Sequence, residues 1–193
     1  MRRKYNNRPH ALVRRIGEMD KLIELKERLK TERPIGWNDF PDINLYKDQL
    51  VVYLKRQLIN LEKEGQLTPA MISNYVKDKL LPKAEGKRYN KEHLALLTEI
   101  CLLKQVLAVK DIDLLLKDEN VSADAKGFYA SFIGKLDKAL SKAAEKVETD
   151  CDRKAIIDMA FKFAIESYCA KLICENLIAI IRKEDAPVNN KKK

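Results

Sequence analysis

The chain has 193 residues, of which 46% are apolar and 35% are charged, and its formal net charge is +9. This length allows a buried core and one or two domains. Gly and Pro are scarce, at six each, and a chain poor in both but rich in Leu, Lys, Ile, Ala and Glu favours an all-α fold.

The positive charge is concentrated in the first half of the chain. Residues 1–30 carry ten cations and four anions, and residues 45–110 carry a net +5, whereas residues 111–181 carry a net −3. A basic first half suits a polyanionic partner such as DNA and leaves the second half for another role.

Catalytic and metal-binding patterns are missing from the sequence. The two histidines, His10 and His93, have no partner at the spacing of metal ligands, and there is no Gly-rich phosphate loop or nucleophile motif. We therefore expect no enzyme, no metal site and no cofactor. The four cysteines form no C-x-x-C pair and are expected to be buried free thiols in a reducing cytosol: Cys101, Cys151, Cys169 and Cys174.

Neither secretion nor membrane insertion is expected. The basic N-terminus is not followed by the apolar segment of a signal peptide. The most apolar stretch, residues 155–181, is interrupted by charged side chains such as Asp158, Lys162 and Glu166, which a membrane-spanning helix would not tolerate. A cytoplasmic location follows as an expectation.

The first third of the chain predicts two helices and a connection. A basic arm and an amphipathic helix at 12–30 make up residues 1–36, and a helix at 45–64 ends at Gly65. Prolines and a glycine make 31–44 a connection. Three apolar residues are expected to attach that connection to the core: Trp37, Phe40 and Ile43.

Residues 68–81 predict a short helix with two different faces. Thr68 is a good N-cap and Pro69 suits the first helical position. One face is apolar, through Ile72, Tyr75, Val76 and Leu80, and the other carries Ala70, Ser73, Asn74 and Lys77. Asn and Ser can hydrogen-bond base edges and Lys can neutralise phosphate, so this second face can enter the major groove of DNA. A solvated face on an all-helical domain is the alternative.

A basic turn is predicted directly after this helix. Leu81-Pro82 should stop the helix, and the Glu85-Gly86 pair can turn a short hairpin. Ser73 to Lys91 contains six Lys or Arg and two Asp or Glu. We predict a recognition helix followed by a basic wing. The expected DNA contacts are Ser73, Asn74 and Lys77 in the groove and Lys83, Lys87 and Arg88 on phosphate. Tyr75 could contact the DNA backbone or could pack as a core ring.

Helices account for the rest of the expected structure. Asn90 caps a helix to about residue 107, and a short helix covers 109–117. Ser122 is predicted to cap a helix to 147, with Asp124 in its first turn, and Asp150 to cap a last helix to 182. The tail at 183–193 is expected to be disordered.

Residues 37–117 carry a resemblance to known regulators. From Asn74 the chain continues NYVKDKLLPKAEGKRYNKEHL, which resembles the DNA-binding half of MerR-type regulators: recognition helix, Leu-Leu element, basic wing, Arg-Tyr pair and capped helix. Together with WNDFPDINLYKDQL it resembles, more closely, the YkrK-like bacterial family of MerR-related transcriptional regulators, catalogued as a domain of unknown function. The resemblance implies a bacterial transcription factor with a winged helix-turn-helix.

Two departures from the MerR pattern change the expected contacts. Ser73 and Asn74 stand where MerR proteins usually have an Arg-Tyr pair, and Lys79 stands where they usually have Gly. The resemblance therefore indicates where contacts lie, and not which atoms make them. No cysteine pattern of the metal-sensing members is present.

The predicted organisation is an arm and helix at 1–36, a MerR-like helix-turn-helix domain at 37–117, a helical C-terminal region at 118–182 and a tail at 183–193. The predicted function is transcriptional regulation by binding double-stranded DNA, and the alternative is a helical protein-interaction module with a basic face for an acidic partner. A homodimer is expected, because the helix at 150–182 is apolar almost all round. The alternative is a monomer in which the helix at 12–30 covers that surface. Any small-molecule effector stays unknown.

Overall fold

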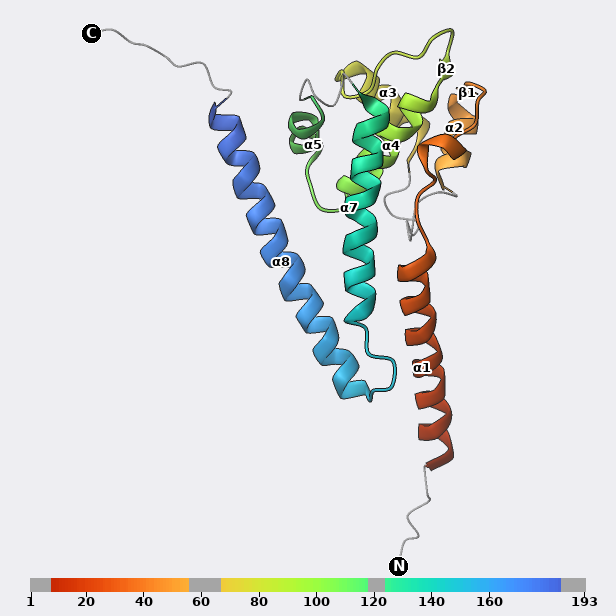
Figure 1. The fold of residues 1–193 in the computed structure, drawn as a ribbon, viewed down its shortest axis with the longest axis vertical. Helices are drawn as coiled ribbons and strands as arrows, with labels where there is room; N and C mark the ends of the chain where they lie inside the picture. Colours follow the sequence, from red (N-terminus) through yellow and green to blue (C-terminus); the bar gives the residue numbers. More distant parts are fainter. Residues whose placement is uncertain (1–7, 56–66, 118–123, 185–193) are drawn as a thin grey trace, which may run out of the picture. The chain divides into compact units, whose positions relative to one another are not determined.

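The computed structural model describes residues 8–55, 67–117 and 124–184, with side chains from Ile16 onward. These residues are mostly helical (Figure 1), which confirms the all-α expectation at this level. The elements are α1 (Arg8–Thr31), the 3-10 helix η1 (Trp37–Asp39), β1 (Leu45–Tyr46), α2 (Lys47–Lys55), α3 (Pro69–Lys77), β2 (Arg88–Tyr89), α4 (Lys91–Leu103), α5 (Val109–Leu116), α7 (Ala125–Glu145) and α8 (Arg153–Glu184).

The start of the second predicted helix is wrong. Residues 45–46 are a strand, and the helix begins at Lys47. Leu45 pairs with Tyr89 and Tyr46 with Arg88 in an antiparallel ladder. Leu45 and Tyr89 are both buried, so this pairing buries two apolar side chains and satisfies backbone groups that a helix end would leave free. The predicted end of that helix and Gly65 lie outside the described residues.

The described chain divides into two compact units, and α7 and α8 contribute residues to both. One unit consists of the described parts of 1–32 and 136–169. Within it the Lys26 ammonium donates to the Val147 carbonyl at 2.8 Å, and Lys146 pairs with Glu166 at 2.7 Å. These contacts join α1, the connection directly after α7 and the first half of α8.

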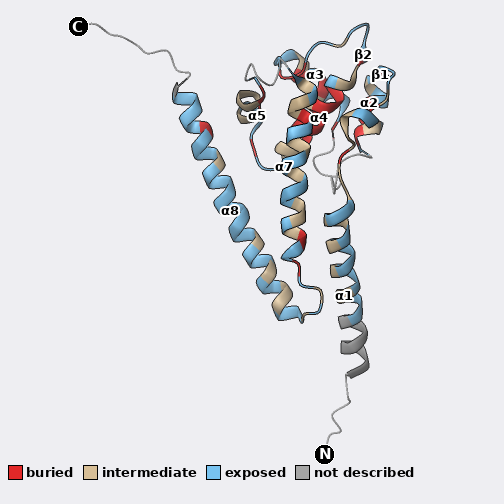
Figure 2. Ribbon diagram, in the orientation of Figure 1, coloured by how far each residue is buried: buried red, intermediate tan, exposed pale blue. Residues whose placement is uncertain are grey.

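The other unit consists of the described parts of 33–135 and 170–193. Its core centres on α4, the helix with the most buried residues in Figure 2. Fully buried aliphatic side chains from α2, α3, α4 and α5 meet there: Leu50, Leu54, Ile72, Leu94, Leu97, Ile100 and Ile112. Each such side chain contributes roughly 1.5–3 kcal/mol on burial, so this cluster holds the short helices together.

Aromatic packing attaches the connection before β1 to this core. Phe40 is 3% exposed, and its ring centroid lies 5.3 Å from that of Tyr129 in α7. The Tyr129 hydroxyl donates to the Ile35 carbonyl at 2.7 Å. Phe40 and the half-buried Trp37 therefore attach the connection to the core, as predicted. The same prediction is wrong for Ile43, which is 71% exposed.

Two predicted helix caps shift along the chain. The last helix is capped by Asp152, whose carboxylate accepts from the Ala155 amide at 2.9 Å, and not by Asp150. Asp124 accepts from the Gly127 amide at 2.8 Å and caps α7, while Ser122 lies outside the described residues. In both cases the aspartate adjacent to the first turn is the one whose oxygen can reach the free amides.

The cysteines are free thiols, but burial was overestimated for three of them. Cys101 is buried, and burial raises its pKa to about 11. Cys151 and Cys174 are half-buried and Cys169 is exposed on α8. Cys169 and Cys174 lie in the apolar pattern of α8, but this helix leaves much of its apolar surface exposed. No helix in the described part of the chain has the length and apolarity to cross a membrane.

Among the described residues of the unit that contains 33–135, one acidic side chain is buried. Glu99 of α4 is 2% exposed, and its Oε1 has no hydrogen-bond partner. Burial raises the pKa of this carboxyl to about 8, because the charged form would lose its hydration without a compensating cation. Glu99 is therefore mostly protonated at neutral pH.

The buried Glu99 should make folding weaker as the pH rises. The unfolded carboxyl loses its proton near its ordinary pKa and the folded one near 8, so the folded state holds the extra proton in between. The free energy of unfolding should then fall between about pH 4.5 and 8, by on the order of 5 kcal/mol relative to Glu99→Gln. Urea unfolding of both proteins across this pH range measures the difference. Parallel pH profiles for the two proteins would contradict the assignment.

Candidate nucleic-acid interface

The N-terminus of α3 forms as its sequence predicts. The Thr68 hydroxyl accepts from the Met71 amide at 3.2 Å, and Pro69 occupies the first helical position. Ile72 and Tyr75 are buried, which fixes the inward face. The opposite face is left open to solvent.

The helix ends earlier than the Leu81-Pro82 step. The Leu80 amide donates to the Tyr75 carbonyl at 2.9 Å and the Lys79 amide to the Val76 carbonyl at 3.2 Å. This pair of bonds is a Schellman motif, which needs a left-handed residue. Lys79 supplies it with φ +60°. The motif turns the chain so that Leu80 and Leu81 are both buried.

Three of the predicted contact residues lie on the open face of α3. Ser73, Asn74 and Lys77 are all exposed. The Ser73 hydroxyl donates to the Pro69 carbonyl at 3.1 Å and accepts from the Lys47 ammonium at 2.8 Å. Lys47 comes from the start of α2, and sequence reasoning missed it because 26 positions separate it from Ser73. The fold thus adds a cation to this face.

The wing turn forms at the predicted place. Glu85 bridges to Arg88, whose amide donates to the Glu85 carbonyl at 2.9 Å. The two central residues, Gly86 and Lys87, have φ values of +53° and +67°, the pattern of a type I′ hairpin turn. The turn exposes the Lys87 side chain.

Arg88 is anchored beside the turn by Tyr46. Its Nη2 donates to the Tyr46 hydroxyl at 3.0 Å, and its guanidinium carbon lies 5.0 Å from the centroid of the Tyr46 ring. A guanidinium stacked on an aromatic face keeps its charge while losing side-chain freedom. Arg88 is therefore a cation held in place at the wing, and Tyr46 is a second residue that the sequence did not single out.

A shallow groove of about 690 Å³ lies between the wing and the helices α2 and α3. Its described lining contains three lysines and one acidic residue. Lys83 and Lys87 were predicted from the sequence, Lys47 was not, and Asp48 is the acidic residue. The groove is therefore positively charged and sits beside the open face of α3, to which Lys47 is hydrogen-bonded.

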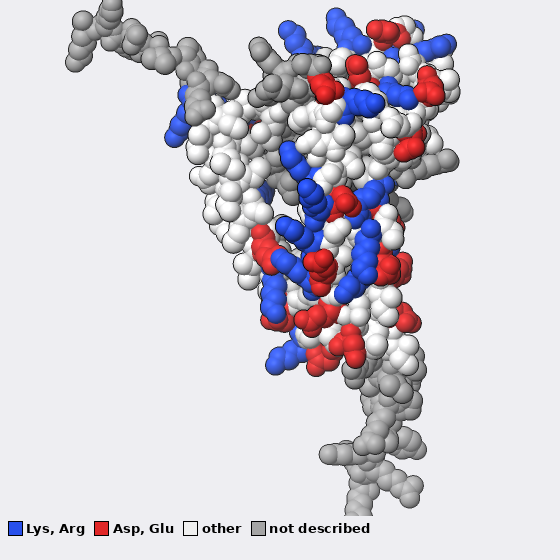
Figure 3. Space-filling model, viewed as in Figure 1, with Lys and Arg blue, Asp and Glu red and all other residues white. Residues whose placement is uncertain are grey.

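Not all predicted contacts fall in this groove. Asn74 and Lys77 are exposed on α3 but do not line the groove. Tyr75 is 5% exposed and packs in the core, where burial raises its pKa; the structure favours the packed-ring alternative for it. On the face drawn in Figure 3, Lys and Arg side chains alternate with Asp and Glu rather than forming one basic area, so the groove, not the overall charge, defines the candidate interface.

His93 has a structural role at the start of α4, which follows the wing. The His93 amide donates to the Asn90 side-chain oxygen at 3.2 Å, and the Asn90 amide donates to His93 Nδ1 at 3.2 Å. The two residues close a capping box at the start of α4. Burial lowers the pKa of His93 despite the nearby carbonyls of Pro82 and Lys83, so it is neutral at pH 7. Among the described residues, no group of three or more His, Cys, Asp or Glu could hold a metal ion.

Comparison with known proteins identifies a family but no individual relative. No curated protein and no solved structure matches the chain significantly. A family model described as a domain of unknown function (DUF1836) matches residues 35–132. The match begins at Ile35, which accepts the Tyr129 hydrogen bond, and passes the predicted domain end at Lys117 to include the first part of α7. Because the match covers half of the chain, the protein belongs to the DUF1836 family.

Proposed function

We propose that this protein is a cytoplasmic bacterial transcriptional regulator that binds double-stranded DNA through α3 and the basic wing. The supporting observation is the juxtaposition of two surfaces. The open face of α3 presents Ser73, Asn74 and Lys77, and the groove beside it presents Lys47, Lys83 and Lys87.

The two surfaces would make different contacts with DNA, one to bases and the other to phosphates. A helix with exposed Asn and Ser can enter the major groove, where an amide contacts adenine through two hydrogen bonds. Lysines beside the helix neutralise phosphates, which positions the protein and supplies most of the affinity. Arg88 adds a cation that Tyr46 already orients, so little entropy is lost when it contacts phosphate.

The backbone supports the MerR-like part of the proposal. Lys79 occupies the place at which MerR proteins usually have Gly, and its φ of +60° lies in the region that favours glycine. The Arg88-Tyr89 pair forms β2, directly before the capped helix α4. A helix-turn-helix would use α2 and α3; the connection between them lies outside the described residues.

An acidic protein partner is the competing function, because a groove lined by lysines also suits carboxylates. The exposed Asn74 favours DNA, since an acidic protein surface gives an amide no specific advantage. The dependence of the binding affinity on salt and on base sequence distinguishes the two functions.

The first prediction concerns the groove lysines. Lys83→Ala with Lys87→Gly removes two cations, and glycine is chosen at 87 because φ there is +67°. Duplex binding should weaken for all sequences, and the slope of log K against log salt should flatten by about two units, close to one per lost phosphate contact. Filter binding over a salt series measures this.

The matched control is Lys110→Ala with Lys126→Ala, which removes the same charge from exposed positions on α5 and α7. If both double variants bind DNA with the same reduced affinity, only net charge matters and the groove is not the contact surface.

The second prediction concerns base preference. Asn74→Ala should leave the fold and the salt slope unchanged, since Asn74 is exposed and carries no charge. It should cost ~1–3 kcal/mol on the preferred site and little on other sequences. Competition between specific and random duplexes measures the ratio. An unchanged ratio would remove Asn74 from the base contacts.

We also propose that the regulator is a homodimer joined through α8. This helix exposes a row of large apolar side chains along its length, and the α1 segment of the same unit leaves them open: Phe161 is 65%, Ile165 61% and Tyr168 66% exposed. Figure 3 shows much of the α8 surface without charge. Contiguous apolar surface of this kind is typical of an interface, and two copies would place two recognition helices on one duplex.

The third prediction follows from α8. Light scattering at micromolar concentration should give twice the chain mass of 22.3 kDa. Ile165→Glu with Tyr168→Glu should give the monomer mass, because it places charges in the apolar row, while helicity by circular dichroism stays constant. A monomer mass for the unmodified protein would overturn the dimer.

A further inference from the structure

A second hollow adjoins the basic groove, with which it shares the lining residues Val76 and Lys83. It has a volume of about 400 Å³, and all of its lining residues belong to the unit that contains residues 33–135. Its walls are mostly apolar and come from the loop, α4 and α5: Leu80, Leu81, Pro82, Ala95, Leu96 and Leu116. Small-molecule sites in proteins have this size and this apolar lining, with a few convergent polar groups.

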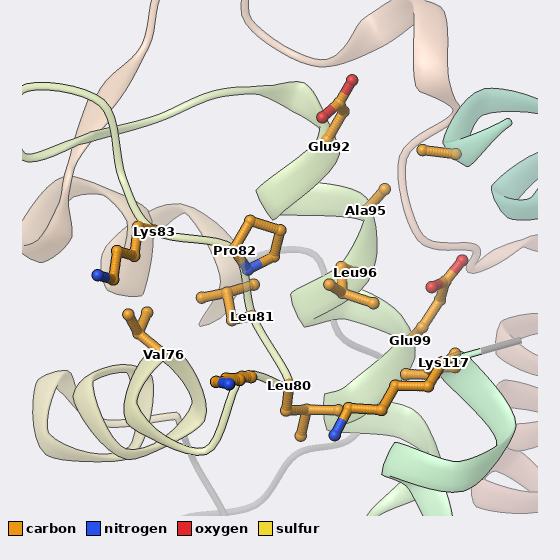
Figure 4. Close-up of a pocket in the computed structure, with 13 residues that line it drawn as sticks. Val76, Leu80, Leu81, Pro82, Lys83, Glu92, Ala95, Leu96, Glu99 and Lys117 are labelled. Carbon is orange, nitrogen blue, oxygen red and sulfur yellow. The ribbon is translucent and has the colours of Figure 1, made fainter. Parts of the chain in front are cut away.

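Glu99 supplies the polar group inside. It lines the hollow from α4, and Figure 4 shows Leu81, Pro82 and Leu96 between Glu99 on one side and Lys83 on the other. Glu99 is 2% exposed, and its Oε1 has no hydrogen-bond partner. Buried polar groups are nearly always paired, so a carboxyl in the wall of an apolar hollow that keeps an unpaired oxygen is free to take a further partner.

The charges around the hollow indicate the sign of that partner. Among the described residues that line it, three are lysines, Lys79, Lys83 and Lys117, and Glu92 is the one acidic residue besides Glu99. Lys117 also pairs with Asp113 at 2.6 Å. Glu99 is neutral at pH 7, because burial raises its pKa to about 8. The described part of the lining therefore carries a net positive charge, which favours an anionic ligand.

A neutral carboxyl and an anion also fit each other chemically. A protonated carboxyl carries one O–H donor, and an O–H donated to a carboxylate is among the stronger hydrogen bonds. Of the groups packed near Glu99 from α7, the Tyr129 phenol cannot compete as donor, since its hydroxyl already donates to the Ile35 carbonyl.

We propose that this hollow binds a small organic carboxylate, whose apolar body packs between Leu81 and Leu96 and whose carboxylate accepts a hydrogen bond from Glu99, while the lysines around the hollow attract its negative charge. The site does not depend on DNA binding. It adds a ligand of defined class to a chain for which the sequence left any effector unknown.

Isothermal titration calorimetry of the full chain tests the proposal with two matched probes, phenylbutyrate and phenylbutylamine. Near pH 6.5 phenylbutyrate should bind with a dissociation constant of about 1 mM or tighter. The amine should bind at least about tenfold more weakly, because the lysines repel it. Failure of phenylbutyrate to bind, or equal binding of the amine, would overturn the proposal.

The pH dependence identifies Glu99. Between about pH 6.5 and pH 9 the affinity for phenylbutyrate should fall about tenfold, since the carboxyl loses the donated proton across this range. In Glu99→Gln the amide still donates, so binding should persist and the fall should vanish. A fall of the same size in Glu99→Gln would assign the effect to another group and contradict the proposal.

Two lysine variants complete the test. Lys79→Gly removes a lining cation at a position whose φ of +60° suits glycine, and it should weaken phenylbutyrate binding severalfold. Lys110→Ala removes an exposed cation outside the hollow and should leave the affinity unchanged. Equal affinities of the two variants would show that the lysines of the hollow do not hold the carboxylate. Circular dichroism verifies that each variant is folded.

Discussion

The candidate interface depends on the pairing of two very short strands. Leu45 and Tyr46 pair with Tyr89 and Arg88, and the two inward residues, Leu45 and Tyr89, are buried. Without this ladder the wing would be a loose turn, because a two-residue hairpin has little stability of its own. With it, Tyr46 lies under the Arg88 guanidinium and Lys47 reaches Ser73. One contact between segments 42 positions apart thus assembles the cations around α3.

The loop from Leu80 to Lys83 contributes residues to two hollows of different chemistry. Val76 and Lys83 line both the basic groove and the apolar hollow, so the two hollows adjoin at these residues. The loop is held by two buried leucines and by the left-handed Lys79. Left-handed conformation at a non-glycine residue costs roughly 1–2 kcal/mol, which the burial of Leu80 and Leu81 offsets.

The local features of the interface could be predicted from sequence, since each depends on neighbouring residues. The cap at Thr68, the two faces of α3 and the turn at Glu85-Gly86 follow from short-range rules, and the structure has all three. The helix end was misplaced because Pro82 is a stronger sequence signal than a lysine in a left-handed conformation.

The long-range features could not be predicted in the same way. Tyr46 contacts Arg88 and Lys47 contacts Ser73 only because a strand, not a helix, precedes α2. Glu99 follows a helical pattern that is indistinguishable from a solvated glutamate until α4 is known to be the central helix of the core. Burial of a single charge is a property of the packed unit, and no local pattern specifies it.

The most direct test of DNA recognition by this chain is selection from a pool of random duplexes with the unmodified protein at moderate salt. The proposed function predicts that successive rounds enrich one recurring sequence, whose retention decreases steeply as salt is raised, as expected for an interface that combines base contacts with several phosphate contacts. A pool that stays random after many rounds, with retention no greater than that of a lysine-rich control protein, would contradict the proposed function and favour an acidic protein partner.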